Sequence, residues 1–371
     1  MEQQVYREEC VDPMVASSNG NTLIARHGIP HEREQSETLT ERVAVSRNSS
    51  ASIKRIVAFF GFIALLIFSL NAMITSGLKR IKTSQYGASN RIMHGDINAQ
   101  IVITGSSRAA SHYDPRIIQE RTGRSAFNLG RNGSQTDMQV AVLKAYLEHN
   151  RKPDVIIHNL DGFTFTTTRE VYDPGQYVPY LSDEEIYKPL RQINPMIWRS
   201  RYMPLYGYVV DDMRFNWVTG LKGLVGWQPR EDFFQGFNPR PGTWSDDFDR
   251  FKVDNPQGVS WEIEPDAIQL VENLIRFCQD NKIQLILVYS PEYSEMQALT
   301  KNRSQIFDEF HKLAGRYGVP MWDYSKWKYS DNTAFFNNSQ HLNARGAREF
   351  SSDLADGLSA FLSAQSIASS K

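Results

Sequence analysis

The most uniform feature of the chain is an apolar stretch without charged residues at positions 56–78. As a helix, its 23 residues would be roughly 34 Å long, enough to cross a hydrocarbon core of about 30 Å. A core helix of a soluble domain usually keeps a polar face, whereas the polar residues here gather near one end, at Ser69, Asn71, Thr75 and Ser76. The pattern predicts one membrane-spanning helix over residues 54–78.

Lysines and arginines flank this stretch on both sides. Lys54 and Arg55 precede it, and Lys79 and Arg80 follow it. Because the positive-inside rule compares the charges of the two short flanks, the sequence does not decide on which side of a membrane the larger C-terminal part lies.

Beyond residue 98, short apolar runs alternate with amphipathic stretches. The runs predict buried strands at 100–104, 125–130, 154–160, 283–290 and 319–325. The stretches carry apolar residues at helical spacing and predict helices at 114–123, 136–150, 265–281, 304–318 and 343–362. Asp114 and Pro115 form a helix start, and Thr136 or Asp137 is expected to cap the next helix. This alternation predicts a three-layer α/β sandwich with a parallel sheet.

The pattern also suggests how the chain is divided. Residues 1–53, with eight acids, five arginines and no lysine, show no sustained period and are expected to form a disordered tail. Residues 79–98 are expected to be a linker and residues 99–365 the α/β domain. Its insert, residues 163–260, holds 19 aromatic residues. These aromatic residues have two expected roles. They lie beside a site at the strand ends, where ring faces suit sugars, or they form a small core or contact a membrane or partner.

The overall composition excludes several functional classes. Forty-one Lys+Arg against 42 Asp+Glu leave a formal charge of −1, without the basic excess of a nucleic-acid-binding protein. Cys10 and Cys278 are far apart, and no Cys/His cluster exists, which argues against a disulfide scaffold and a zinc site. With 371 residues, 41% of them hydrophobic, the chain can form one large domain with attachments.

Polar residues follow the predicted strands, at the edge where parallel sheets form their sites. The first strand is followed by Gly105-Ser106-Ser107-Arg108, and the second by a loop, residues 128–134, that contains Gly130 and Gly133. Asn159 and Asp161 follow at the third, and a segment containing His341 precedes the last helix. Each group alone is typical of an ordinary turn, loop or cap. Their combination and order are more specific.

In this order the residues resemble the SGNH/GDSL hydrolase superfamily. Gly105-Ser106-Ser107 resembles its Gly-Asp-Ser block, and Asn338-Ser339-Gln340-His341 resembles its Asp-x-x-His block. The segment from His158 to Asp161 is a reduced form of its Gly-x-Asn-Asp block. The run QHLNARGAREF resembles membrane-tethered branches of the superfamily similar to envelope polysaccharide O-acetylation and D-alanyl transfer proteins.

The resemblance implies a flavodoxin-like three-layer sandwich of the SGNH type, preceded by one transmembrane helix, with no cofactor and no metal. It implies that Ser107 is the nucleophile and His341 the general base. The oxyanion donors would be the backbone N–H groups of Ser107 and Gly133, with Gly130 beside them, and the side chain of Asn159.

Two positions leave alternatives open. Asn338 stands where the family has its acid, so it can accept a hydrogen bond from the imidazole but offers no negative charge; Asp323 is another carboxylate, expected either to reach the site or to cap a turn. Arg108 is expected either to bind an anionic substrate group, such as a uronate or phosphate, through its planar fork or to form a salt bridge.

Three functions follow as hypotheses. The first is a membrane-anchored serine esterase or O-acyltransferase acting on an acylated envelope or exported polysaccharide, with a membrane-bound acyltransferase or export protein as partner. The second is a catalytically silent scaffold that binds glycan or a membrane partner. The third is phosphate or nucleotide binding at residues 104–108, although no GxGxxG motif or Walker lysine is present. The resemblance implies a bacterial inner-membrane protein, single-pass, with its large domain periplasmic or extracytoplasmic.

Overall fold

The computed structural model describes residues 37–210, 216–229, 233–240 and 242–369, with side chains described only between residues 52 and 364. Residues 1–36 of the predicted disordered tail lie outside the described part. Helix α1 begins at Glu37 and ends at Leu78, so the tail prediction is wrong for residues 37–53.

Five parallel strands form one sheet in the order β2-β1-β3-β4-β5. They are β1 (Ile101–Thr104), β2 (Ala126–Asn128), β3 (Val155–Leu160), β4 (Gln284–Tyr289) and β5 (Met321–Asp323). Strands β1 and β3 are buried along their whole length, as expected of a parallel sheet covered on both faces. The strand order reverses beside β1, and in such sheets this is the place for a site.

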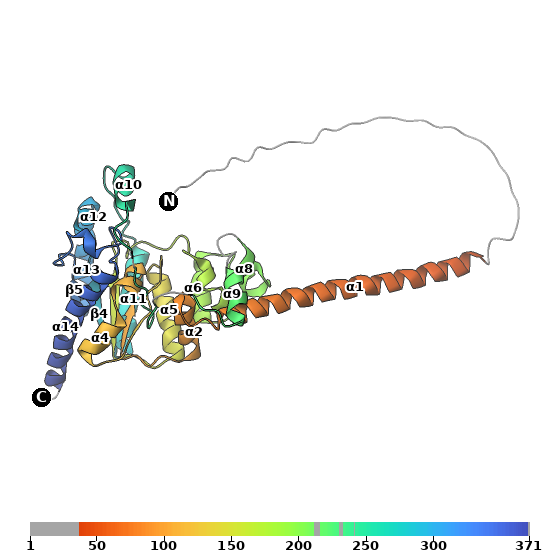
Figure 1. Cartoon of the computed structure of the whole chain (residues 1–371), viewed down its shortest axis with the longest axis horizontal. Coiled ribbons are helices and arrows are strands. Elements are labelled where there is room, and N and C mark those ends of the chain that lie inside the picture. The colour runs from red at the N-terminus through yellow and green to blue at the C-terminus, as the bar shows by residue number, and fades with distance from the viewer. Residues whose placement is uncertain (1–36, 211–215, 230–232, 241, 370–371) are drawn as a thin grey trace. The chain divides into compact units, whose positions relative to one another are not determined.

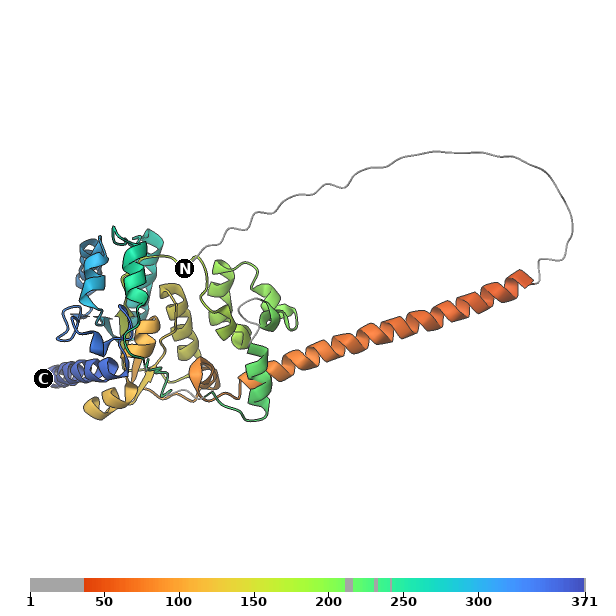
Figure 2. The same ribbon diagram turned by 45° about the horizontal axis from the view of Figure 1, so that its top comes forward.

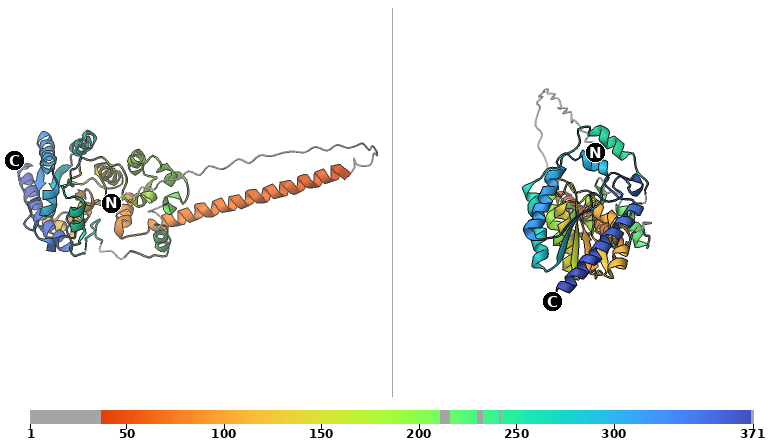
Figure 3. Two further views of the ribbon diagram at one scale, coloured as in Figure 1. Left: turned by 90° about the horizontal axis from the view of Figure 1, so that it is seen from above. Right: turned by 90° about the vertical axis from the view of Figure 1, so that its left-hand side faces the viewer.

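Helices cover both faces of the sheet, which confirms the predicted three-layer α/β architecture. On one face, the core joins the sheet to α5 (Thr136–His149), α11 (Pro265–Asp280) and α13 (Arg303–Tyr317). On the other, it joins the sheet to α3 (Ser107–His112), α4 (Pro115–Thr122) and α14 (Ala344–Ser369). Figure 1 shows α5 and α11 on one side of the strands and α4 and α14 on the other, and in Figure 3 α14 lies across its face.

Most predicted helices form within a few residues of their expected bounds. Asp114 caps α4, where its side chain accepts a hydrogen bond from the Arg116 N–H, and Pro115 is the first helical residue. The cap of α5 is Gln135 rather than Thr136 or Asp137. Short α12 (Ser294–Leu299) and the 3₁₀ turn η4 (Thr333–Phe335) complete this part of the domain.

The predicted linker, residues 79–98, is instead part of the folded domain. It contains α2 (Ser84–His94), whose Ala88 and Ile92 lie in the core beneath α5. Asn90 is buried, and its amide donates to the carbonyls of Leu78 and Ile81. Small and polar residues dominate this helix, so its buried face does not stand out as an apolar stripe.

The aromatic insert is helical and shares the main core. It comprises η1 (Pro174–Gln176), η2 (Val178–Tyr180), α6 (Glu184–Ile193), α7 (Trp198–Tyr202), α8 (Tyr206–Val209), α9 (Asn216–Leu224) and α10 (Asp247–Asp254). Phe165, Tyr177 and Leu190 are buried together with residues of β3 and α5. These side chains of the insert therefore extend the core of the α/β domain and do not form a separate core.

The last turns of α1 pack against α8 and α9 (Figure 2). Asn71 Oδ1 accepts a hydrogen bond from the Leu205 N–H, and Thr75 Oγ1 lies 2.8 Å from the Tyr208 hydroxyl. A Cβ at Gly77 would fall 1.7 Å from the Gly220 carbonyl oxygen, so only glycine permits this close approach of two helix backbones. Two of the four polar residues near the end of the apolar stretch, Asn71 and Thr75, are thus bonded within the protein.

Candidate active site

The turn after β1 presents a serine hydroxyl at the carboxyl edge of the sheet. Ser106 caps α3, with its side chain accepting a hydrogen bond from the Arg108 N–H, and Ser107 is the first residue of the helix. Ser107 Oγ lies 2.8 Å from His341 Nε2. This distance is within the range expected of a nucleophile and its general base.

Asn338 holds the imidazole of His341 from its other side. Asn338 Oδ1 lies 2.9 Å from His341 Nδ1 and also accepts the backbone N–H groups of Gln340 and His341. Because an amide oxygen can only accept, this bond requires the proton on Nδ1 and leaves Nε2 unprotonated toward Ser107. The three residues brought together therefore have the arrangement of a catalytic triad with a neutral third member.

The imidazole of His341 is held in its neutral form. Burial, together with the positive charges of Arg240 and Arg108, lowers the pKa of His341 to about 3. The neutral form is the one that accepts a proton, so the base is ready over the whole neutral range. No negative charge opposes this shift, because Asn338 stands in place of a carboxylate.

A second histidine, His112, supports the site from the end of α3. Its ring meets His341 edge to face with centroids 6.2 Å apart. His112 Nε2 accepts the Leu342 N–H, while Nδ1 lies 3.0 Å from Ser290 Oγ. Burial lowers the pKa of His112 well below its usual value. It is therefore a fully bonded neutral ring that fixes the segment carrying His341, a role the sequence did not reveal.

The loop after β2 lies against the serine turn. The N–H of Arg131 and the hydroxyl of Ser134 both donate to the Gly105 carbonyl. In the part of the chain that the structure describes, the N–H groups of Ser107 and Gly133 have no hydrogen-bond partner. Gly133 has φ +63°. Of the oxyanion donors that the resemblance implies, these two backbone N–H groups are therefore free to bind a ligand oxygen.

Gly130 and Asn159, which the resemblance implies as oxyanion donors, are both hydrogen-bonded within the protein. The N–H of Gly130 donates to Asn128 Oδ1, and a Cβ at Gly130 would lie 2.3 Å from the Ala110 nitrogen. Gly130 thus permits close packing of the loop on α3. The buried amide of Asn159 donates to the Leu160 carbonyl and to Asp161 Oδ1, which leaves neither of its protons for a substrate.

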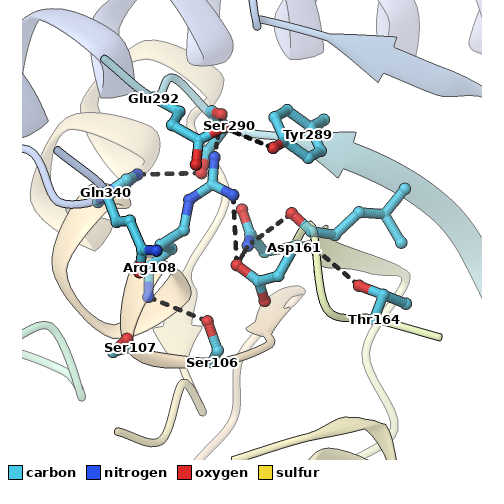
Figure 4. A network of polar contacts seen from close by, with 12 residues as sticks. Ser106, Ser107, Arg108, Asp161, Thr164, Tyr289, Ser290, Glu292 and Gln340 are labelled. Carbon is cyan, nitrogen blue, oxygen red and sulfur yellow. Dashed lines mark hydrogen bonds and ion pairs between the residues drawn. The ribbon is translucent and has the colours of Figure 1, made fainter. Parts of the chain in front are cut away.

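Arg108 forms the salt bridge that was one of its two expected roles. Its side chain is 4% exposed and lies 3.4 Å from Asp161 Oδ1. Its Nη2 donates to the Ser290 carbonyl, and the guanidinium stacks on Tyr289 at 4.6 Å. Figure 4 shows the group enclosed between Asp161 and Ser290. Burial raises the pKa of Asp161 to about 6, against the opposing effect of Arg108.

Asp323 remains outside the site. Its carboxylate accepts the Ser325 N–H and so caps a turn, the other of its two expected roles. For metals, Glu148, His149 and Asp183 place ligand atoms within 4.8 Å of one another. However, Glu148 and His149 are exposed and His149 already pairs with Asp183 at 2.9 Å, so this group does not point to a bound ion.

A second residue that the sequence analysis missed is Arg240, in the insert. It lines a cavity of about 300 Å³ together with Asn132, Asn238, Pro239 and Asn337. The position of Asn132 near the site could have been predicted from the sequence, because it lies between Gly130 and Gly133. Arg240 lies in GFNPRPG, a segment without a motif, and only the fold brings it to the triad.

Comparisons with known proteins find only distant similarities. No protein-family model matches the chain, and no curated protein matches it. One similar solved structure is a lipolytic protein of the G-D-S-L family from Desulfitobacterium hafniense, 10% identical, covering 70% of this chain and 98% of its own with a TM-score of 0.35. Another is a GDSL-like lipase from Bacteroides thetaiotaomicron, 8% identical, covering 74% and 100%, with a TM-score of 0.33. At such low identities and TM-scores, these structures say nothing about the function of this chain, which is inferred from the geometry of the site.

Proposed function

We propose that this protein is a membrane-anchored serine esterase or O-acyltransferase acting on acyl esters of an envelope or exported polysaccharide. The observation that carries the proposal is the contact of Ser107 Oγ with His341 Nε2 at 2.8 Å, with Asn338 Oδ1 on the opposite ring nitrogen. Polysaccharide as the acyl carrier rests on the resemblance of the segment around His341 to membrane-tethered SGNH proteins.

The reaction follows from this geometry. Ser107 Oγ attacks the ester carbonyl carbon while its proton passes to His341 Nε2, and the N–H groups of Ser107 and Gly133 bind the oxyanion. The ester C–O bond breaks, the leaving alkoxide takes the proton from His341, and an acyl-serine remains. Water or a sugar hydroxyl then attacks, giving its proton to His341, and the proton returns to Ser107 as the acyl group leaves. Water as acceptor gives an esterase, whereas a sugar hydroxyl gives a transferase.

A fluorophosphonate probe tests the nucleophile. The full-length protein in detergent is expected to be labelled at Ser107, because the probe reports a serine hydroxyl activated by a base. Ser107→Ala is expected to abolish labelling. Ser111→Ala is the matched control, since it removes a hydroxyl from the same helix that bonds only to the Ser107 carbonyl. No labelling of folded wild-type protein between pH 5 and 9 would contradict the proposal.

The second candidate is a catalytically silent scaffold that binds glycan or a membrane-bound acyltransferase or export protein. The neutral Asn338 and the engaged amides of Gly130 and Asn159 favour it, since each removes charge or donors from the transition state. Glycan binding that persists unchanged in Ser107→Ala and His341→Ala, without turnover by the wild type, is the outcome expected of this scaffold.

Membrane anchoring is supported by the exposure of α1. The helix is long and apolar enough to span a bilayer over Ser52–Leu78, and Phe60, Leu65 and Phe68 are each about 60% exposed. We propose that α1 spans a bacterial inner membrane and that the α/β domain lies in the periplasm. This orientation rests on the family resemblance.

The part of the insert that contains α7, α8 and α9 exposes apolar side chains that suit a membrane interface. Trp198, Trp217 and Trp227 are each about 40% exposed, and α8 and α9 contact α1 at Thr75 and Gly77. Tryptophan prefers the level of the lipid headgroups. These three indoles are therefore expected to lie in the interface.

Quenching by brominated lipids measures this placement in the full-length protein reconstituted into vesicles. Replacing Trp198, Trp217 and Trp227 with phenylalanine is expected to remove most of the quenchable fluorescence. The matched control replaces Trp244, Trp261 and Trp322, whose rings pack against Tyr293, Phe163 and Phe361, and is expected to retain it. Equal loss of quenching in both triple variants would show that the three indoles do not contact lipid.

A further inference from the structure

Arg240 is fixed beside the triad by backbone hydrogen bonds of its segment. The Gln235 carbonyl accepts the Asn128 N–H, and the Asn238 N–H donates to the Ala110 carbonyl. The Arg240 carbonyl accepts the Ala344 N–H. The segment therefore contacts the end of β2, helix α3 and the start of α14, which are the elements that surround Ser107 and His341.

The guanidinium of Arg240 has no protein partner in the described ranges. Its Nε is buried without a hydrogen bond, and none of the carboxylates described in the structure forms an ion pair with it. Arg240 is half-buried, and this partial burial lowers its pKa, as expected of a cation partly removed from water without a counter-ion. Because partial desolvation without a partner is unfavourable, the arrangement suits a side chain whose partner is a ligand.

The cavity around Arg240 is polar and close to the reacting atoms. Asn132, Asn238 and Asn337 line it, and Asn132 directly precedes the oxyanion donor Gly133. Asn337 also donates its N–H to the His341 carbonyl at 2.8 Å. Three amides offer donors and acceptors for hydroxyl groups, and a guanidinium matches a carboxylate through two parallel hydrogen bonds. At about 300 Å³ the cavity is at the small end of ligand sites, a size suited to a short sugar segment.

We propose that this cavity is a substrate subsite for a carboxylate-bearing sugar, with Arg240 binding the carboxylate and the three asparagines binding hydroxyls. The proposal rests on the proposed function, because it places the sugar unit next to the acyl group that Ser107 attacks. It also reassigns the anion-binding role that the sequence gave to Arg108.

Binding to the full-length Ser107→Ala protein in detergent tests the subsite without turnover. The ligands are an O-acetylated oligoglucuronate and the corresponding neutral O-acetylated oligoglucoside, measured by calorimetry. The acidic ligand is expected to bind about 10–100-fold more tightly, as a charge-assisted bidentate contact provides. Adding Arg240→Gln is expected to remove this preference. Adding Arg348→Gln, which removes the same charge from an exposed position on α14, is expected to retain it.

The outcomes separate the subsite from the catalytic proposal. Equal binding of the two ligands, binding of neither, or a preference that survives Arg240→Gln would each overturn the subsite. If the acidic preference depends on Arg240 while the wild-type protein is never labelled at Ser107, the subsite stands and the enzymatic proposal fails.

Discussion

Asn338→Asp is expected to increase acyl transfer by about 10–1,000-fold at neutral pH. The side chains have nearly the same shape, and the new carboxylate would accept the same bond from His341 Nδ1 that Asn338 Oδ1 accepts at 2.9 Å. Its charge stabilises the imidazolium that forms as Ser107 attacks. An opposite charge at this distance favours the protonated form by about 1–3 pKa units, each worth about 1.4 kcal/mol.

The pH dependence of kcat/KM gives a second readout of the same change. With the pKa of His341 lowered to about 3, the wild-type base is neutral above pH 5, so kcat/KM should not fall between pH 8 and pH 5. In Asn338→Asp the pKa rises, and the acid limb is expected between about pH 4 and 6. Asn332→Asp adds the same charge at an exposed helix cap and should change neither the rate of acyl transfer nor the pH dependence of kcat/KM. If Asn338→Asp lowered kcat/KM and left the acid limb of the pH profile unchanged, Asn338 would not be the residue that orients His341.

Asp161→Ala is expected to cost about 3–5 kcal/mol of unfolding free energy, because it leaves the Arg108 guanidinium buried without its ion partner. For a domain of this size, that corresponds to a melting temperature lower by about 6–20 °C. Both side chains are nearly inaccessible, at 4% and 2%, so water cannot replace the carboxylate. The measurement is thermal unfolding of the full-length protein in detergent.

Two further variants separate pairing from packing. Arg108→Met combined with Asp161→Ala removes both charges and is expected to be more stable than Asp161→Ala alone. Asp154→Ala breaks the half-exposed pair with Arg124 and is expected to cost less than about 1 kcal/mol. If Asp161→Ala melted like Asp154→Ala, the buried pair would not be a structural element.

The sheet and its main helices could be predicted because their patterns are continuous. Runs such as VIIHNL in β3 are buried at every position, and Asp114-Pro115 starts α4 as its residue types require. Helix α2 was missed because its buried face is built from Gly87, Ala88, Ser89 and Asn90. Six-residue α3 is too short to show a helical period.

Within the candidate site, residue type predicted the pairing of Ser107 with His341 but not the hydrogen-bond donors around it. Ser107 and His341 could be matched because hydroxyl and imidazole must occupy fixed places in such chemistry. The roles of Gly130 and Asn159 depend on which carbonyls lie within reach of their N–H groups. The position of Arg240 depends on backbone hydrogen bonds that hold its segment of the insert against β2, α3 and α14. Neither kind of information is present in the spacing of residues along one chain.

The close packing of Gly77 on Gly220 and the burial of α2 join the last turns of α1 directly to the domain that carries Ser107. In the proposed membrane protein, this domain could therefore not move away from the bilayer on a flexible tether. An acylated substrate would have to approach the membrane to reach Ser107.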